Sequence, residues 1–176
     1  MNPWLLLAGS IGCLVGTHMT DYHEAYPLKL AFYTMFVGCT GVTLIPLIQM
    51  SSAALIADAA LATGLSMASL ATVAYMAPSE QFLMWGGGLS MACGGMFAVS
   101  MLGMFYPGSS ALYNIWLYGG LVLSGGLVLY RTQNIIQSAK TDYKYDPIGH
   151  SVGIYLDAVN IFVRMLMILQ GNKNKK

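Results

Sequence analysis

The sequence predicts an all-α fold, namely a polytopic bundle of membrane-spanning helices. Hydrophobic residues make up 56% of the 176 residues and charged residues only 9%, whereas about a quarter of a soluble domain is charged. Six apolar stretches approach or exceed the length of about 20 residues that crosses a bilayer. Short links join the first five of these stretches and favour antiparallel neighbours. We therefore expect a single transmembrane domain over residues 1–176.

The expected spans follow one another along the whole chain. The second opens on Lys29, which can snorkel toward water. After Tyr130 the helical spacing continues but turns polar, so this helix is expected to run beyond the membrane. Asp146 and Pro147 fit an N-cap followed by proline at the first helical position, and they start the last span. The six spans are residues 3–19, 28–48, 53–77, 82–105, 112–130 and 148–169.

Small residues at four-residue spacing predict sites of close helix packing. Lysine and arginine are nearly balanced between the two sides of the predicted bundle, so the positive-inside rule predicts no orientation. The small-residue pairs are Gly12 with Gly16, Gly120 with Ser124, and Gly149 with Gly153.

Charge and motifs argue against several classes of function. A net charge of +1 offers no basic surface for nucleic acid. No phosphate-binding loop, nucleophile elbow or metalloprotease motif is present, so we expect no enzyme and no cofactor. The cysteines are widely spaced and the methionines lack clustered cysteine or histidine partners, so we expect packing roles and no metal site.

Ionisable residues inside the spans are the strongest functional candidates. Asp157, Asn160 and Arg164 fall on one stripe of the last helix. Asp58 lies inside the third span, and Arg131 lies at the edge of the fifth. In the simpler interpretation the arginines snorkel and Asp58 caps nearby backbone. Asp157 lies near mid-membrane, where it needs either a cationic partner or a bound proton.

Several segments resemble the Bax-inhibitor-motif (TMBIM) family, in particular its mitochondrial branch, the growth-hormone-inducible transmembrane proteins. The resemblance implies a seven-helix-type bundle in the mitochondrial inner membrane, linked to calcium and proton movement and to membrane organisation. It also implies that an additional first span is missing from this chain. The matching segments are residues 76–80 (MAPSE), 117–122 (LYGGLV), 145–148 (YDPI) and 154–162 (IYLDAVNIF).

The chain departs from the family pattern in its charges. The family motif Tyr-Asp-Thr-Gln reads Tyr-Arg-Thr-Gln here, with Arg131 in place of the aspartate that pairs with the acid matched by Asp157. Asp58 stands where relatives often carry arginine. An arginine offers no oxygen to a cation and stays protonated. We therefore hypothesise that Arg131 pairs with Asp157, with Asp58 or with both, and keeps them ionised near neutral pH.

The resulting function prediction is a non-transporting structural or interaction subunit of an inner-membrane assembly, with a respiratory complex as one possibility. Besides the lipid bilayer, we expect a helix of another subunit against the segment from Trp4 to Met19. The alternative is a proton-coupled calcium transporter or leak channel, with Asp157 as titrating acid and Asp58 and Asn160 as oxygen donors. A third possibility is a scaffold that shapes the membrane without a fixed complex.

Overall fold

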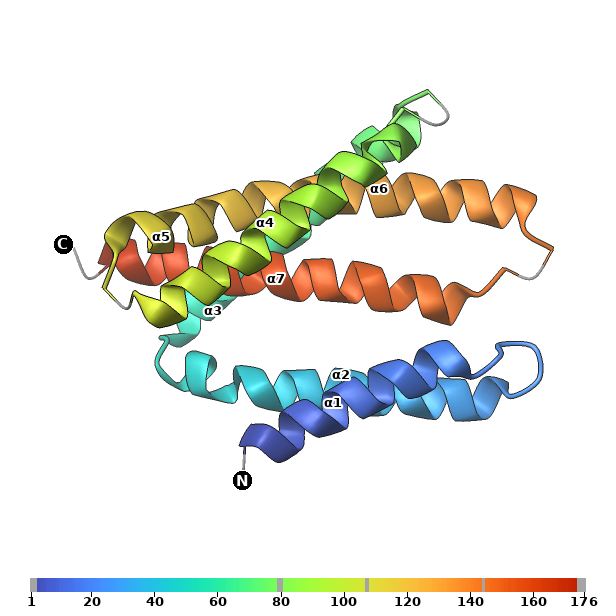
Figure 1. Cartoon of the computed structure of the whole chain (residues 1–176), viewed down its shortest axis with the longest axis horizontal. Coiled ribbons are helices and arrows are strands. Elements are labelled where there is room, and N and C mark those ends of the chain that lie inside the picture. The colour runs from blue at the N-terminus through green and yellow to red at the C-terminus, as the bar shows by residue number, and fades with distance from the viewer. Residues whose placement is uncertain (1–2, 79–80, 107, 144, 174–176) are drawn as a thin grey trace. The chain divides into compact units, whose positions relative to one another are not determined.

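The computed structural model describes residues 3–78, 81–106, 108–143 and 145–173. Within these residues the chain is helical and contains no β-strand, which confirms the all-α prediction (Figure 1). The chain divides into two compact units, and each is described by itself. Unit 1 comprises Met1–Ala53 and Asp142–Gly153, and unit 2 comprises Ala54–Thr141 and Ile154–Lys176. The single-domain prediction stays a prediction, and Ser79 and Glu80 of the family-like segment lie outside the described residues.

The helices follow the predicted spans closely. The elements are α1 (Pro3–Met19), α2 (Tyr26–Gln49), α3 (Ala53–Met76), the 3-10 turn η1 (Leu83–Trp85), α4 (Gly86–Phe105), α5 (Ser110–Asn114), the π-helical turn η2 (Ile115–Gly119), α6 (Gly120–Thr141) and α7 (Pro147–Lys173). Five helical stretches are long and apolar enough to cross a membrane: Tyr26–Gln49, Ala53–Met76, Leu83–Phe105, Ser110–Thr141 and Pro147–Asn172. Helix α1 has 17 residues, which rise about 26 Å and fall slightly short of a hydrocarbon core of about 30 Å.

In unit 1, α1 and α2 pack side by side as an antiparallel hairpin (Figure 1). Gly16 permits their close approach, because a Cβ built on it would lie 3.1 Å from the Phe32 ring. A Cβ added to Gly12 would meet nothing within 4 Å among the described residues, so the packing role of Gly12 stays a prediction. Thr17 is fully buried, and its hydroxyl donates to the Cys13 carbonyl at 2.8 Å, which satisfies it inside its own helix.

In unit 2, α4 crosses α6, and α6 runs antiparallel to the part of α7 that begins at Ile154 (Figure 1). The predicted fifth span is one continuous helical run that contains the π-helical turn η2 and extends to Thr141, as its polar continuation indicated. The Gln133 side chain joins this helical run to the connection between α3 and η1. Its Oε1 accepts from the Phe82 backbone N–H at 2.7 Å, and its Nε2 donates to the Pro78 carbonyl at 3.0 Å.

Large apolar side chains are exposed along the helices of unit 2. Leu65 is 71% exposed, Val122 78% and Met91 80%. Lipid tails are as apolar as these side chains, so a membrane helix gains nothing by hiding them. The buried apolar residues form a small core, which includes Ala59, Phe82, Leu117, Val128, Ile161 and Leu166.

Candidate functional site

The centre of unit 2 is an ion pair between α6 and α7. Arg131 Nε lies 2.9 Å from Asp157 Oδ2, and the Asp157 side chain is only 3% exposed whereas that of Arg131 is 38% exposed. Asp157 faces the interior because it shares a buried stripe of α7 with Ile161 and Arg164. Of the pairings proposed for Arg131, the structure therefore contains the one with Asp157.

The hydrogen bonding of this pair is incomplete. The Arg131 Nε–H is not aligned with Asp157 Oδ2, and both atoms are buried without a hydrogen-bond partner in the described chain. The contact is therefore an ion pair held by charge and proximity. Its chemical consequence is that a guanidinium occupies the space beside Oδ2, where the cation of a calcium site would need to sit.

Arg164, two turns further along α7, is held by an aromatic residue. Its Nη1 donates to the Trp116 carbonyl, and its guanidinium carbon lies 4.4 Å from the centre of the Trp116 ring. Trp116 belongs to the π-helical turn η2, and its carbonyl also accepts from the Gly120 backbone N–H, so this oxygen receives both a backbone and a side-chain donor. Gly120 makes room for the guanidinium, because an added Cβ would collide with it. Ser124 is buried four residues later, and the predicted packing of helices at Gly120 and Ser124 stays a prediction.

Two sequence-predicted site residues lie outside this arrangement. Asn160 is exposed, because it lies at the margin of the α7 stripe and turns away from the buried face. Asp58 is also exposed, and its carboxylate has no ion pair or hydrogen bond among the described residues. Of the alternatives for Arg131, pairing with Asp58 is therefore not observed, and Asn160 does not join Asp157 in an ion site, as the transporter alternative would require. A polar residue at the edge of a stripe can face either side, and sequence spacing alone does not choose.

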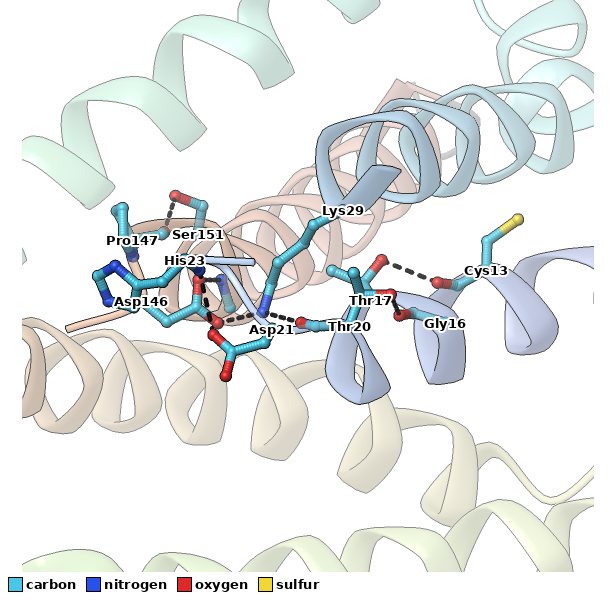
Figure 2. Close-up of polar contacts among 11 residues, drawn as sticks. Cys13, Gly16, Thr17, Thr20, Asp21, His23, Lys29, Asp146, Pro147 and Ser151 are labelled. Atoms are coloured by element: carbon cyan, nitrogen blue, oxygen red, sulfur yellow. Dashed lines mark hydrogen bonds and ion pairs between the residues drawn. The ribbon is translucent and has the colours of Figure 1, made fainter. Parts of the chain in front are cut away.

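Unit 1 contains a second ion pair, which the sequence analysis missed (Figure 2). Lys29 of α2 contacts Asp146 Oδ2 and donates to the Thr20 carbonyl at 2.9 Å. The Lys29 side chain is 4% exposed and that of Asp146 is 31% exposed. The expectation that Lys29 snorkels is wrong, because the loop after α1 closes over the ammonium. The sequence offered one signal, because a lysine within an apolar helix requires an acidic partner. It did not indicate which acidic residue that partner is.

Asp146 uses its second oxygen to cap α7. Oδ1 accepts from the Gly149 backbone N–H at 3.1 Å, which confirms the predicted N-cap. A Cβ on Gly149 would lie 2.6 Å from Oδ2. Gly149 therefore clears space for this carboxylate, and its predicted role in helix packing with Gly153 is corrected. Gly153 itself is buried. We call the Lys29 to Asp146 ion pair, together with the Asp146 cap on α7, the clamp. A small polar pocket of about 260 Å³ adjoins the clamp and is lined in part by His18, Asp21 and Tyr22.

The rival calcium function would require several oxygen ligands around one position. In the part of the chain that the structure describes, no three histidine, cysteine, aspartate or glutamate side chains converge as metal ligands. Met96 packs its methyl group at the position where Gly119 lacks a Cβ, 3.3 Å away, whereas Met91 and Met104 face outward. The methionines thus divide between helix packing and the lipid-facing surface.

The fold and these contacts define a multi-pass helical membrane protein with buried ion pairs. Residues 1–175 match the family described as Inhibitor of apoptosis-promoting Bax1. Rat growth hormone-inducible transmembrane protein is 32% identical over 99% of this chain and 54% of its own length. A probable Bax inhibitor 1 of Paralichthys olivaceus is 34% identical over 98% of this chain and 74% of its own length. Human Bax inhibitor 1 is 31% identical, with 96% and 72% covered.

The chain therefore belongs to the Bax inhibitor family of multi-pass membrane proteins, which confirms the resemblance. It spans about half the length of the rat growth hormone-inducible relative and nearly three quarters of the two Bax inhibitor 1 relatives.

Proposed function

We propose that this protein is a non-transporting, non-enzymatic member of its family that serves as a structural or interaction subunit of an assembly in the mitochondrial inner membrane. The observation that carries the proposal is the Arg131 to Asp157 ion pair. An acid that binds and releases protons or calcium needs access and free oxygens. Asp157 is buried, and a permanently charged guanidinium lies against it. The pair therefore acts as a fixed strut between α6 and α7.

Two surfaces support an interaction role. On α1, Ile11 is 52% exposed and Val15 is 49% exposed, on the segment where a partner helix is expected. Helix α4 has no buried residue and carries glycines that allow close approach of another helix. The proposed mitochondrial location is supported by the resemblance to the mitochondrial branch of the family and by the similarity to the growth hormone-inducible relative. The lipid bilayer is the other expected partner.

Calcium flux in liposomes tests the absence of transport. We expect purified protein to show no pH-dependent calcium flux, and Arg131→Asp, which restores a pair of carboxylates with Asp157, to gain it. Lys140→Asp is the matched control, because it makes the same charge change at an exposed position on α6. The proposal would be contradicted, and the transporter alternative established, if the unmodified protein showed pH-dependent calcium flux that Asp157→Asn abolished.

Purification in gentle detergent tests the subunit role. We expect other inner-membrane proteins to co-purify in fixed stoichiometry. A photo-crosslinker at the exposed Val15 should capture a protein, whereas one at Thr17, which is buried in unit 1, should crosslink within the chain. Crosslinks from Val15 to lipid alone would count against a partner on α1. Purification as a homo-oligomer with no other protein would favour the scaffold alternative.

A further inference from the structure

Arg131 also lines a pocket that the ion pair does not fill. The pocket has a volume of about 350 Å³ and lies between α4 and α6 within unit 2. Its lining includes polar atoms as well as aliphatic wall. The residues used below are Leu89 and Ser90 from α4, and Leu127, Tyr130 and Arg131 from α6.

The pocket is supplied with unused hydrogen-bond donors. Arg131 Nε is buried against Asp157, yet the side chain as a whole is 38% exposed. Its Nη groups form no hydrogen bond with the described residues and are not buried, so four N–H donors stay accessible. Tyr130 adds a hydroxyl without a partner in the described chain, and its ring lies where a Cβ on Gly86 would come within 3.0 Å.

Asp157 holds the guanidinium in place for this purpose. The Asp157 carboxylate lies 2.9 Å from Nε and attracts the guanidinium by its charge, and the two Nη groups remain as a fork of donors. A fork of this kind binds two oxygens of a phosphate or carboxylate together. Because the positions of the donors are set in advance, less entropy is lost on binding.

The depth of the pocket indicates which anion reaches it. Arg131 lies at the end of the apolar stretch of α6, where the chain turns polar. Its contact with Asp157 therefore places that acid within one arginine side chain of this boundary, closer to it than the expected mid-membrane position. Hydrocarbon gives way to lipid headgroups at such a boundary, and arginine and tyrosine are typical residues there. Leu89 and Leu127 line the pocket as its apolar wall. We propose that this pocket binds the phosphate group of an anionic phospholipid through Arg131 Nη and the Tyr130 hydroxyl. The site goes beyond the proposed subunit role and does not depend on it.

Retention of lipid by the purified full chain tests the proposal. The protein would be equilibrated in detergent with phosphatidylglycerol and phosphatidylcholine, and the bound lipids identified by native mass spectrometry. We expect preferential retention of phosphatidylglycerol, reduced about tenfold by Arg131→Lys, which keeps the charge but loses the fork. Lys140→Gln is the control, because it removes an exposed positive charge from α6 outside the pocket and should leave retention unchanged.

Two further variants leave the ion pair intact, so the test stands even where Arg131→Lys fails to fold. Tyr130→Phe removes only the hydroxyl, and Ser90→Leu fills the pocket from α4; both should lower phosphatidylglycerol retention. Addition of inorganic phosphate distinguishes the sources of the anion. Chloride serves as the control for ionic strength. If inorganic phosphate releases the lipid at concentrations well below the chloride concentration that has the same effect, the pocket is a soluble phosphate site and the lipid assignment is overturned. Equal retention of both lipids, or unchanged retention in Tyr130→Phe and Ser90→Leu, would also overturn it.

Discussion

The two ion pairs are built in opposite ways. In unit 1 the cation is hidden, with Lys29 4% exposed and its partner Asp146 31% exposed. In unit 2 the anion is hidden, with Asp157 3% exposed and its partner Arg131 38% exposed. The first pair is also better satisfied, because Lys29 has a backbone carbonyl and Asp146 caps a helix. In the second pair neither contacting atom has an aligned hydrogen bond.

This difference predicts which member of each ion pair contributes more to the stability of its unit. Removing one member of a pair is most costly when the other is left buried and charged. The exposed member can instead be solvated or can snorkel after its partner is lost. We therefore expect unit 1 to depend on its acid and unit 2 on its base. Replacing each member of the two pairs by an apolar residue, one at a time, and comparing the losses of stability tests this expectation.

The largest effect is expected for Asp146→Ala. It leaves Lys29 buried beside only a carbonyl, which costs about 3–5 kcal/mol, and it removes the α7 cap, which costs about 1 kcal/mol more. Lys29→Met should cost about 1 kcal/mol, because Asp146 stays hydrated and still caps α7. The free energy of unfolding in mixed SDS micelles measures both. Asp142→Ala, at an exposed site four residues earlier, is the control. Equal losses from the two clamp variants would break the comparison.

A smaller loss of stability is expected in unit 2, where losing the base should cost more than losing the acid. Arg131→Leu strands the buried Asp157 carboxylate and should cost about 3 kcal/mol. Asp157→Leu should cost about 1 kcal/mol, since the half-exposed Arg131 can turn to water or headgroups. The double variant should recover most of the loss, because a well-packed apolar pair replaces a buried ion pair at little cost. The same unfolding assay measures the cycle, and additive losses would show that the two charges are not coupled.

The smallest effect isolates the geometry of the clamp. Gly149→Ala places a Cβ against Asp146 Oδ2, so the carboxylate must shift and weaken its cap and its contact with Lys29. We expect a loss of about 1 kcal/mol. Gly171→Ala is the matched control, because an added Cβ meets nothing within 4 Å and alanine favours the helix. Stabilisation by both substitutions would show that Gly149 has no role in the clamp.

Two signals made much of the fold predictable. Hydrophobic length located the helices within a few residues, and the Asp146 and Pro147 pair located the start of α7. The partner of Arg131 was predictable in part, because a buried acid in a membrane requires compensation and Asp157 was the deepest acid. The exclusion of Asp58 and Asn160 was not predictable, because both lie on stripes whose facing depends on neighbouring helices.

The sequence by itself determined the membrane class, the helix positions and the requirement that Asp157 find a positive charge. Each of these follows from local chemistry: apolar length, capping residues and the cost of an isolated charge in hydrocarbon. Only the tertiary structure decided that Lys29 meets Asp146, 117 positions away, and that Arg164 donates to the Trp116 carbonyl. Such contacts join residues distant in the chain, and helix packing selects them from several partners of equal chemistry.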